Sequence, residues 1–133
     1  EVFAVIGQNS VEKMNAGVYR YETEGHRLLP GLAGDLRAAV ARVSLSQVWM
    51  AEAPVNLVVC ADYDRITGKY GERGVRYAMI EAGHIGQNIF LQAEALGLKA
   101  GIVGAFHDDR LNAVLDLTPS HEPLLVMPVG FGA

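Results

Sequence analysis

A long run of apolar residues at helical spacing constrains this chain more than any other feature. Between residues 76 and 96 the apolar positions form two stripes that together cover most of the circumference of a helix. A helix that is apolar on nearly every side is normally buried between layers or between subunits. We therefore predict a long buried central helix that ends at Gly97. The first stripe is Ala78, Ala82, Ile85, Ile89, Ala93 and Leu96, and the second is Tyr77, Ile80, His84 and Leu91.

Two glycines interrupt this helical pattern within the segment EAGHIGQN, residues 81–88. Gly83 and Gly86 share a face, and each costs about 0.5–1 kcal/mol of helix stability relative to alanine. We therefore expect another body to lie close against that face. It is a second helix, a symmetry-related subunit or a flat cofactor. The polar residues His84 and Gln87 are then core or interface groups, with a catalytic role as the alternative.

Glu81 and His84 form a Glu-x-x-His pair, the spacing that di-iron carboxylate bundles use on their helices. Such a site needs a second pair and further carboxylates from other helices, and the sequence offers neither. His107 is followed by two aspartates and is better explained by the start of a short helix. We predict no metal site.

Composition and charge narrow the class of protein. The chain has 133 residues, half of them apolar, and a net charge of −4, which offers nucleic acid and anionic membranes no general attraction. We predict a single domain over residues 1–133 and neither a nucleic-acid nor a membrane partner. The single cysteine, Cys60, lies in an apolar run and excludes an internal disulfide. No membrane span or signal peptide is evident, so we expect a cytoplasmic protein.

Short apolar runs and turn signals predict the remaining elements. An interleaved order of strands and helices after a hairpin indicates an α+β fold, with a mixed sheet sandwiched by helices. Residues 100–106 form a short strand or a close-approach loop. Asp35 is available as a cap or first-turn acid of the first helix. The expected strands are 1–7, 55–61 and 123–130, the expected hairpin spans 18–29, and the expected short helices are 36–43 and one that begins near Asp108.

Four ordered segments of the chain resemble one protein family. They are GVYRYETEGHRL, the string KYGERGVRYAMIEAGHIGQNIFLQAEALGL, the loop GIVGAF, and the closing strand EPLLVMPVG. Together they resemble the FMN-dependent nitroreductase-like oxidoreductases, specifically the SagB-type branch of thiazoline and oxazoline dehydrogenases. The similarity runs from about residue 1 to residue 130.

This resemblance implies a homodimer with FMN at the subunit interface, to which the central helix contributes. A dimer then becomes the favoured reason for Gly83 and Gly86. The loop GIVGAF occupies the position where backbone amides approach the flavin ring near N5, and this maps onto Ile102, Val103, Gly104 and Ala105. A backbone N–H there stabilises the negative charge of reduced flavin without occupying space.

Lys69 and Tyr70 match the Lys-Tyr pair that azoline-oxidising members use around proton removal. Oxidation of a ring C–H requires a base as hydride leaves for the flavin, and a lysine in an apolar cleft can serve when its pKa is lowered. The residues alone allow a plainer interpretation, an exposed lysine beside a packed tyrosine.

The family segment that holds the FMN phosphate corresponds to positions before Glu1, so we expect a partial, N-terminally truncated domain. The predicted function is hydride transfer between FMN and either NAD(P)H or an organic substrate, a small molecule or a peptide. Lys69 and Tyr70 favour azoline dehydrogenation in peptide modification. The alternatives are a general nitro or quinone reductase, and a flavin-free scaffold or dimerisation partner with the same fold.

Overall fold

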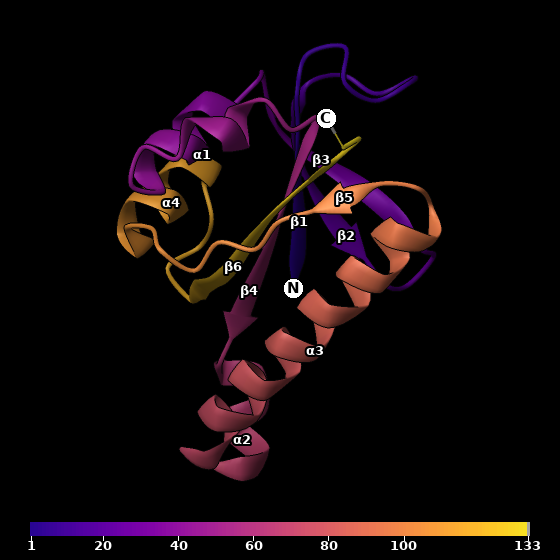
Figure 1. Ribbon diagram of the computed structural model, residues 1–133. Coiled ribbons are helices and arrows are strands. Elements are labelled where there is room, and N and C mark those ends of the chain that lie inside the picture. The colour runs from indigo at the N-terminus through magenta and orange to yellow at the C-terminus, as the bar shows by residue number, and fades with distance from the viewer. Residues whose placement is uncertain (133) are drawn as a thin grey trace.

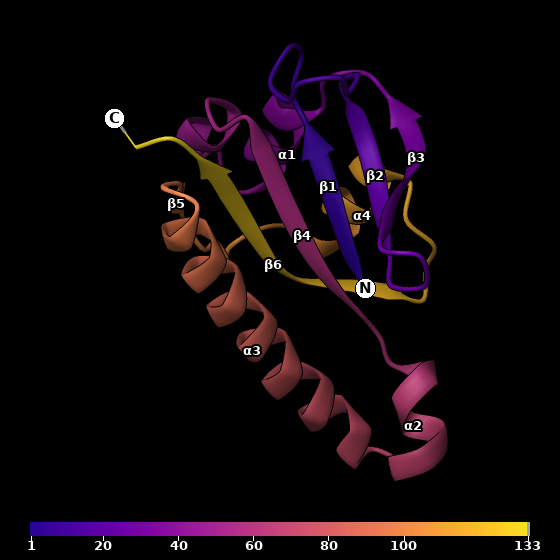
Figure 2. The same cartoon turned by 90° about the vertical axis from the view of Figure 1, so that its right-hand side faces the viewer.

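The computed structural model describes residues 1–132 as one six-stranded sheet with helices on both faces (Figures 1 and 2). The strand order is β3-β2-β1-β4-β6-β5. The strands are β1 (Val2–Ile6), β2 (Gly17–Glu22), β3 (Arg27–Ala33), β4 (Val55–Asp62), β5 (Lys99–Ala100) and β6 (His121–Gly130). The helices are α1 (Arg37–Val43), α2 (Asp64–Tyr70), α3 (Arg73–Ala95) and α4 (Asp108–Leu115), with a 3-10 turn η1 (Val48–Ala51).

The predicted α+β class, the first strand and the hairpin are confirmed. The sheet differs from the expected mixed sheet, because each strand pair in the described part of the chain is antiparallel. β4 pairs with β1 on one side and with β6 on the other, so the sequence-distant ends of the chain lie at its centre. The helices that separate β4 from β6 therefore return the chain in the opposite direction.

The hydrophobic core lies between the sheet and the helices α1 and α4. Phe3 and Val5 alternate along β1 toward this layer, while Ala4 and Ile6 point to the opposite face. Leu111 and Leu115 close the core from α4. The buried core residues are Phe3, Val5, Val18, Val40, Ala41, Met50, Val58, Cys60, Val103, Leu111, Leu115 and Val126.

Helix α3 crosses the other face of the sheet and is buried on one side only. It begins three residues earlier than predicted and ends as expected, with Gly97 at φ +73° and Leu98 N–H donating to the Ala93 carbonyl at 2.8 Å. The expected all-round burial is not found within one chain, because small residues meet the sheet and the larger apolar ones face outward. The buried residues are Gly74, Ala82, Gly86 and Ala93, and the exposed large ones are Tyr77, Met79, Ile80 and Leu91.

The two glycines of α3 have different surroundings. A Cβ at Gly86 would lie 3.3 Å from Leu125 Cδ1 and 3.6 Å from Met127 Sδ, so contact with β6 inside the chain explains the absence of a side chain. A Cβ at Gly83 would meet nothing within 4 Å. A close neighbour is therefore found at Gly86, but it is the sheet of the same chain and not the predicted second helix, subunit or cofactor.

Two short helical segments were not predicted. Helix α2 lacks an apolar stripe, contains Gly68, and has no buried residue, so its sequence carries no helical periodicity. It ends at Gly71, whose φ is +57°. The turn η1 is held by the buried Asn56, whose Nδ2 donates to the Met50 carbonyl at 3.0 Å.

Among the described residues, no helix combines the length and apolar character that crossing a membrane requires.

An ion pair fastens the end of β1 to the start of α1 and of β4. Asp35 accepts hydrogen bonds from Gln8 N–H at 2.8 Å, from Arg37 Nε at 2.9 Å and from Arg37 Nη2 at 2.7 Å. It also accepts the Arg37 N–H at 3.2 Å. Asp35 lies one residue before the N-cap, Leu36, so it is neither the cap nor the first-turn acid that we predicted. Arg37 Nη1 donates to the Ala53 carbonyl at 3.0 Å. The Arg37 hydrogen bond holds the pKa of Asp35 well below its usual range.

We expect Asp35→Asn to lower the free energy of unfolding by about 1 kcal/mol at neutral pH, since several charge-assisted hydrogen bonds are lost at a partly exposed site. A depressed carboxyl pKa stabilises the fold above the unfolded value of about 3.9, and this contribution disappears as the pH falls below it. Urea titrations from neutral to acid pH should therefore converge for the two proteins. The control is Glu12→Gln, which removes an exposed 3.9 Å pair with Lys13 and should change nothing. If Asp35→Asn and the unsubstituted protein were equally stable at neutral pH, the Asp35 hydrogen bonds would not stabilise the fold.

Candidate functional site

The loop between β5 and α4 is anchored to the sheet and to α1 through its backbone. Val103 N–H donates to the Val126 carbonyl at 2.8 Å, and Val126 N–H returns a bond to the Val103 carbonyl at 2.9 Å. Gly101 N–H donates to the Pro128 carbonyl at 2.9 Å, and His107 N–H to the Val43 carbonyl at 3.0 Å. Of the residues between these anchors, Gly104 and Ala105 are thereby held at the surface, while Phe106 packs against the core.

The four predicted cofactor residues divide between core and surface. Val103 is buried in the core, so its side chain faces away from any ligand and its N–H is already used. Ile102 is 49% exposed, and Gly104 and Ala105 are exposed. Among residues 1–132, the N–H groups of Gly104 and Ala105 donate to no acceptor, and a Cβ at Gly104 would meet nothing within 4 Å. The loop therefore presents two free donors beside open space.

Residues around η1 contact this loop, and no pattern in the sequence indicated them. Gln47 Nε2 donates to the Ser44 carbonyl at 3.0 Å and approaches the Ala105 carbonyl at 3.4 Å. The indole of Trp49 lies against Gly101, where a Cβ would be 3.1 Å from it. These contacts depend on where η1 places its side chains, which no periodicity reveals.

Lys69 and Tyr70 lie at the C-terminal end of α2, away from the loop. Both are exposed, Lys69 Nζ lies 5.1 Å from the centroid of the Tyr70 ring, and Tyr70 packs edge-on against Tyr77 at 5.3 Å. Helix α3 is about 34 Å long, with α2 at one end and β5 at the other (Figure 1). A single chain therefore does not bring this pair to the loop. Within one chain the pair is an exposed lysine beside a packed tyrosine, which is the alternative that the residues alone allow.

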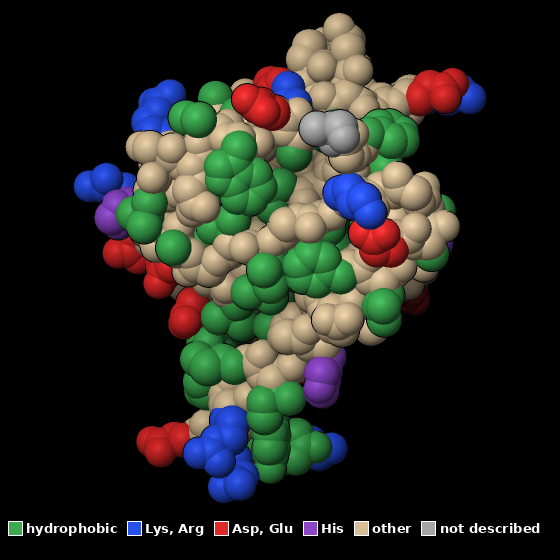
Figure 3. Space-filling view, in the orientation of Figure 1, with side chains coloured by type: hydrophobic (Ala, Val, Ile, Leu, Met, Phe, Trp, Pro, Cys, Tyr) green, Lys and Arg blue, Asp and Glu red, His purple; other side chains and the backbone are tan. Residues whose placement is uncertain are grey.

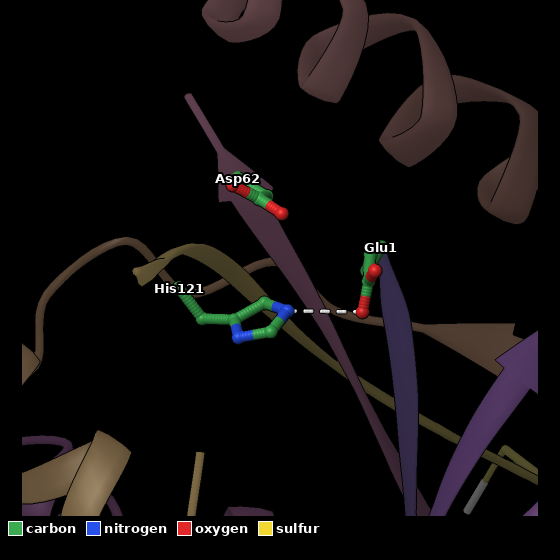
Figure 4. A group of neighbouring side chains, drawn as sticks. All are labelled: Glu1, Asp62 and His121. Carbon is green, nitrogen blue, oxygen red and sulfur yellow. Dashed lines mark hydrogen bonds and ion pairs between the residues drawn. The ribbon is translucent and has the colours of Figure 1, made fainter. Parts of the chain in front are cut away.

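The predicted Glu81–His84 pair is exposed on α3 and does not belong to any larger group of ligating side chains within the described residues. Such a group forms elsewhere, from Glu1, Asp62 and His121, whose ligating atoms all lie within 4.8 Å of one another (Figure 4). The sequence analysis missed this group because strand register, rather than sequence spacing, brings it together.

Hydrogen bonds and ion pairs order this three-residue group. His121 Nε2 lies 2.9 Å from Glu1 Oε2, and Arg65 Nη1 donates to Glu1 Oε1 at 3.2 Å. Burial alone would raise the pKa of the Glu1 carboxyl, but the hydrogen bond and charge of His121 lower it, with a further contribution from Arg20. The carboxylate form of Glu1 is thus favoured.

Two neighbouring grooves open beside this group. One has a volume of about 280 Å³ and lies between β4 and the helices α2 and α3, with Asp62, Arg65 and Glu81 among its lining residues. The other has a volume of about 760 Å³ and extends toward the hairpin of β2 and β3. Glu1, Asp62, Arg65 and Ile85 line both, so the two carboxylates of the group can be reached from either groove, whereas His121 lines neither.

Cys60 is buried on β4, as predicted, and burial raises the pKa of its thiol to about 12. A protonated thiol packed in the core cannot act as a nucleophile at neutral pH. We therefore exclude Cys60 from the candidate site.

We expect the native protein to react with a thiol reagent such as DTNB only through transient unfolding, because the Cys60 thiol is both buried and protonated. In guanidinium, one thiol per chain should react at once. The measurement is the absorbance of released thionitrobenzoate in both conditions. Rapid stoichiometric labelling of the native protein would contradict the burial of this residue.

Comparisons with known proteins agree with this geometry. The model of the Nitroreductase family matches residues 3–131. The Methanocaldococcus jannaschii protein MJ1384, named as a nitroreductase, is 38% identical over 125 residues, which cover 94% of this chain and 62% of that protein. The chain thus spans less than two thirds of this curated relative.

Two solved structures superpose on the whole chain. A nitroreductase from Anabaena variabilis has a TM-score of 0.91 and 26% identity, and the match covers 27% of that chain. The E. coli microcin synthetase McbBCD complex, with truncated pro-MccB17 bound, contains a chain with a TM-score of 0.89 and 26% identity, of which 52% is covered.

Proposed function

This chain belongs to the nitroreductase family, and we propose that it forms the flavin-facing part of an FMN-dependent oxidoreductase. The observation that carries the proposal is the pair of free N–H donors at Gly104 and Ala105, on a loop anchored at both ends. The proposal is supported by the resemblance, because in the family that the chain resembles the flavin ring lies against the corresponding loop. Bound FMN would supply the hydride chemistry, accepting or giving a hydride at its ring.

The loop residues fit a flavin ring sterically and electrostatically. Gly104 leaves open space in which a flat ring can approach the backbone, and Ala105 adds only a methyl group. Two N–H groups directed at the ring would stabilise the negative charge that develops on reduction. Because Val103 and His107 are hydrogen-bonded to Val126 and Val43, these donors are positioned before the ring arrives.

We expect Gly104→Val to weaken FMN binding by about tenfold or more, since its side chain would occupy the space that the ring needs. The measurement is the quenching of flavin fluorescence when apo protein is titrated with FMN. The control is Gly68→Val on α2, where a Cβ likewise meets nothing within 4 Å, and it should bind FMN normally. Equal affinity of the Gly104 variant and the unsubstituted protein would remove the loop from the flavin site.

Within this function, we favour azoline dehydrogenation during peptide modification, with a small-molecule or peptide substrate. Support comes from the Lys69-Tyr70 pair of the SagB-type pattern and from the structural likeness to a chain of the McbBCD complex. Lys69 would take the proton from the azoline ring carbon as hydride leaves the ring, and Tyr70 would orient the Lys69 amine. This pair is exposed in one chain, so the role requires another segment or a second copy to cover it. General reduction of nitro compounds or quinones by NAD(P)H is the alternative.

Lys69→Ala separates these two enzymatic functions. We expect it to slow azoline oxidation by about 10²–10⁴-fold, the usual cost of losing a general base, while FMN-dependent quinone reduction by NAD(P)H continues. Both rates are measured on flavin-loaded protein. Lys13→Ala removes another exposed lysine and serves as the control. Unchanged azoline oxidation would show that Lys69 is not the base.

We further propose a homodimer through α3. The apolar side chains along this helix are exposed in one chain, and Figure 3 shows hydrophobic side chains on this face of the molecule down to the end where α3 adjoins α2. Gly83 leaves an open place among them for a second chain.

We expect Gly83→Leu to shift the dimer toward monomer in sedimentation-velocity runs, and Gly68→Leu to leave it intact. An undisturbed dimer in the Gly83 variant would move the contact to another face.

A further inference from the structure

Glu1, Asp62 and His121 come from three neighbouring strands at one end of the sheet. Glu1 immediately precedes β1, Asp62 ends β4, and His121 begins β6. Asp62 and His121 are register partners, and the backbone of Glu1 exchanges hydrogen bonds with Cys60 on β4. Figure 4 shows the three side chains converging in front of these strands. Their approach is therefore set by the backbone ladder rather than by flexible side chains alone.

The imidazole of His121 is held in place before any ligand arrives. Its ring packs edge-on against Phe3 with 5.7 Å between the ring centroids, and Thr118 Oγ1 is hydrogen-bonded to Nδ1. A histidine that binds a metal usually donates its second ring N–H to such an oxygen, which leaves the other nitrogen as the ligand. In that tautomer, the Nε2 lone pair of His121 points at the group's carboxylates.

The two oxygens of Glu1 have different partners. Arg65 lies 3.2 Å and Arg20 lies 4.0 Å from Oε1, so the arginines neutralise that side of the carboxylate. Oε2 lies 2.9 Å from His121 Nε2. Without a metal, a proton on Nε2 makes this contact a hydrogen bond to Oε2. A divalent cation would displace that proton and take Nε2 and Oε2 as neighbouring ligands. Asp62 supplies a third donor on the same side.

The donor set and its spacing suit a first-row divalent cation. One imidazole nitrogen and two carboxylate oxygens are ligands that Zn²⁺ accepts, at about 2.0–2.2 Å each. Ligand atoms in a tetrahedral site are then about 3.4 Å apart, so the present spread of up to 4.8 Å closes with small side-chain movements. Because Glu1 and Asp62 line the adjoining grooves, water could reach a bound ion from the carboxylate side.

We propose that Glu1, Asp62 and His121 bind one divalent cation, best matched by Zn²⁺, which joins the ends of β1, β4 and β6 and keeps one coordination position open to the adjoining grooves. The site lies apart from the Gly101–His107 loop and does not depend on flavin binding. The nearby Arg20 and Arg65 oppose the positive charge of the ion, but both contact Glu1 Oε1, so the ion would bind Oε2, on the side that faces His121.

The test is calorimetric titration of the intact protein with ZnCl₂ after dialysis against EDTA. We expect one Zn²⁺ per chain, binding at least about tenfold more weakly in His121→Gln and Asp62→Asn. Thr118→Val, which removes the hydroxyl that contacts Nδ1 and Ser120 but no ligand, should weaken Zn²⁺ binding by about 10–100-fold. The matched control is His84→Gln, an exposed histidine with a carboxylate nearby in sequence, and it should bind Zn²⁺ as the unsubstituted protein does.

A second measurement is independent of whether the variants fold. Crystals of the unsubstituted protein soaked in ZnCl₂ should give an anomalous difference peak among Glu1, Asp62 and His121. The absence of stoichiometric binding, full affinity in His121→Gln, an equal loss in His84→Gln, or a peak elsewhere would each overturn the proposal. None of these readouts involves FMN, so they do not bear on the proposed oxidoreductase function.

Discussion

The antiparallel pairing of β4 with β6 is the contact on which the rest of this structure depends. The ladder runs from Val55 opposite Val129 to Asp62 opposite His121. At one of its ends it brings Asp62 and His121 together. Along its outer edge, β6 receives β5 and Val103, which fixes the loop that presents the Gly104 and Ala105 donors. The two candidate sites are thus consequences of one strand register, although they lie in different parts of the molecule.

The two faces of the sheet are covered to different extents by packed apolar side chains. One face is closed by α1 and α4 over a continuous apolar core. The other is crossed by α3, which contacts the sheet through glycine and alanine and directs Met79, Ile80 and Leu91 outward. Exposed apolar surface of this extent is typical of an interaction face. Lys69 and Tyr70 lie at the end of α2, which adjoins the start of α3, and both are exposed in one chain. The proposed dimer and the proposed base role therefore both require a partner surface at this end of the molecule.

Sequence patterns predicted elements better than they predicted contacts. The strands β4 and β6 were found from continuous apolar runs, and the end of α3 from Gly97, because each signal is local. Helix α2 and η1 were missed because their side chains form no periodic stripe. The direction of pairing in the sheet, and with it the meeting of Glu1 with His121, depends on register between segments 120 positions apart. No spacing within the sequence encodes that distance.

The same limit applies to the loop that carries the proposed function. Its four residues were identified by resemblance, but only the structure separates Val103, committed to the core, from Gly104 and Ala105, whose N–H groups are free. Gly86 illustrates the converse case. The family resemblance made a partner subunit the favoured reason for a glycine at this position. In the structure, a side chain here would instead crowd Leu125 and Met127 of the same chain.

The most direct test of the oxidoreductase account is the absorbance spectrum of the purified intact protein between about 300 and 550 nm, followed by chromatography of whatever denaturation releases. Our account predicts flavin bands near about 370 and 450 nm and the release of FMN, in a ratio near one per chain. A colourless protein that also fails to take up added FMN would contradict it and would leave this nitroreductase-family chain as a flavin-free scaffold.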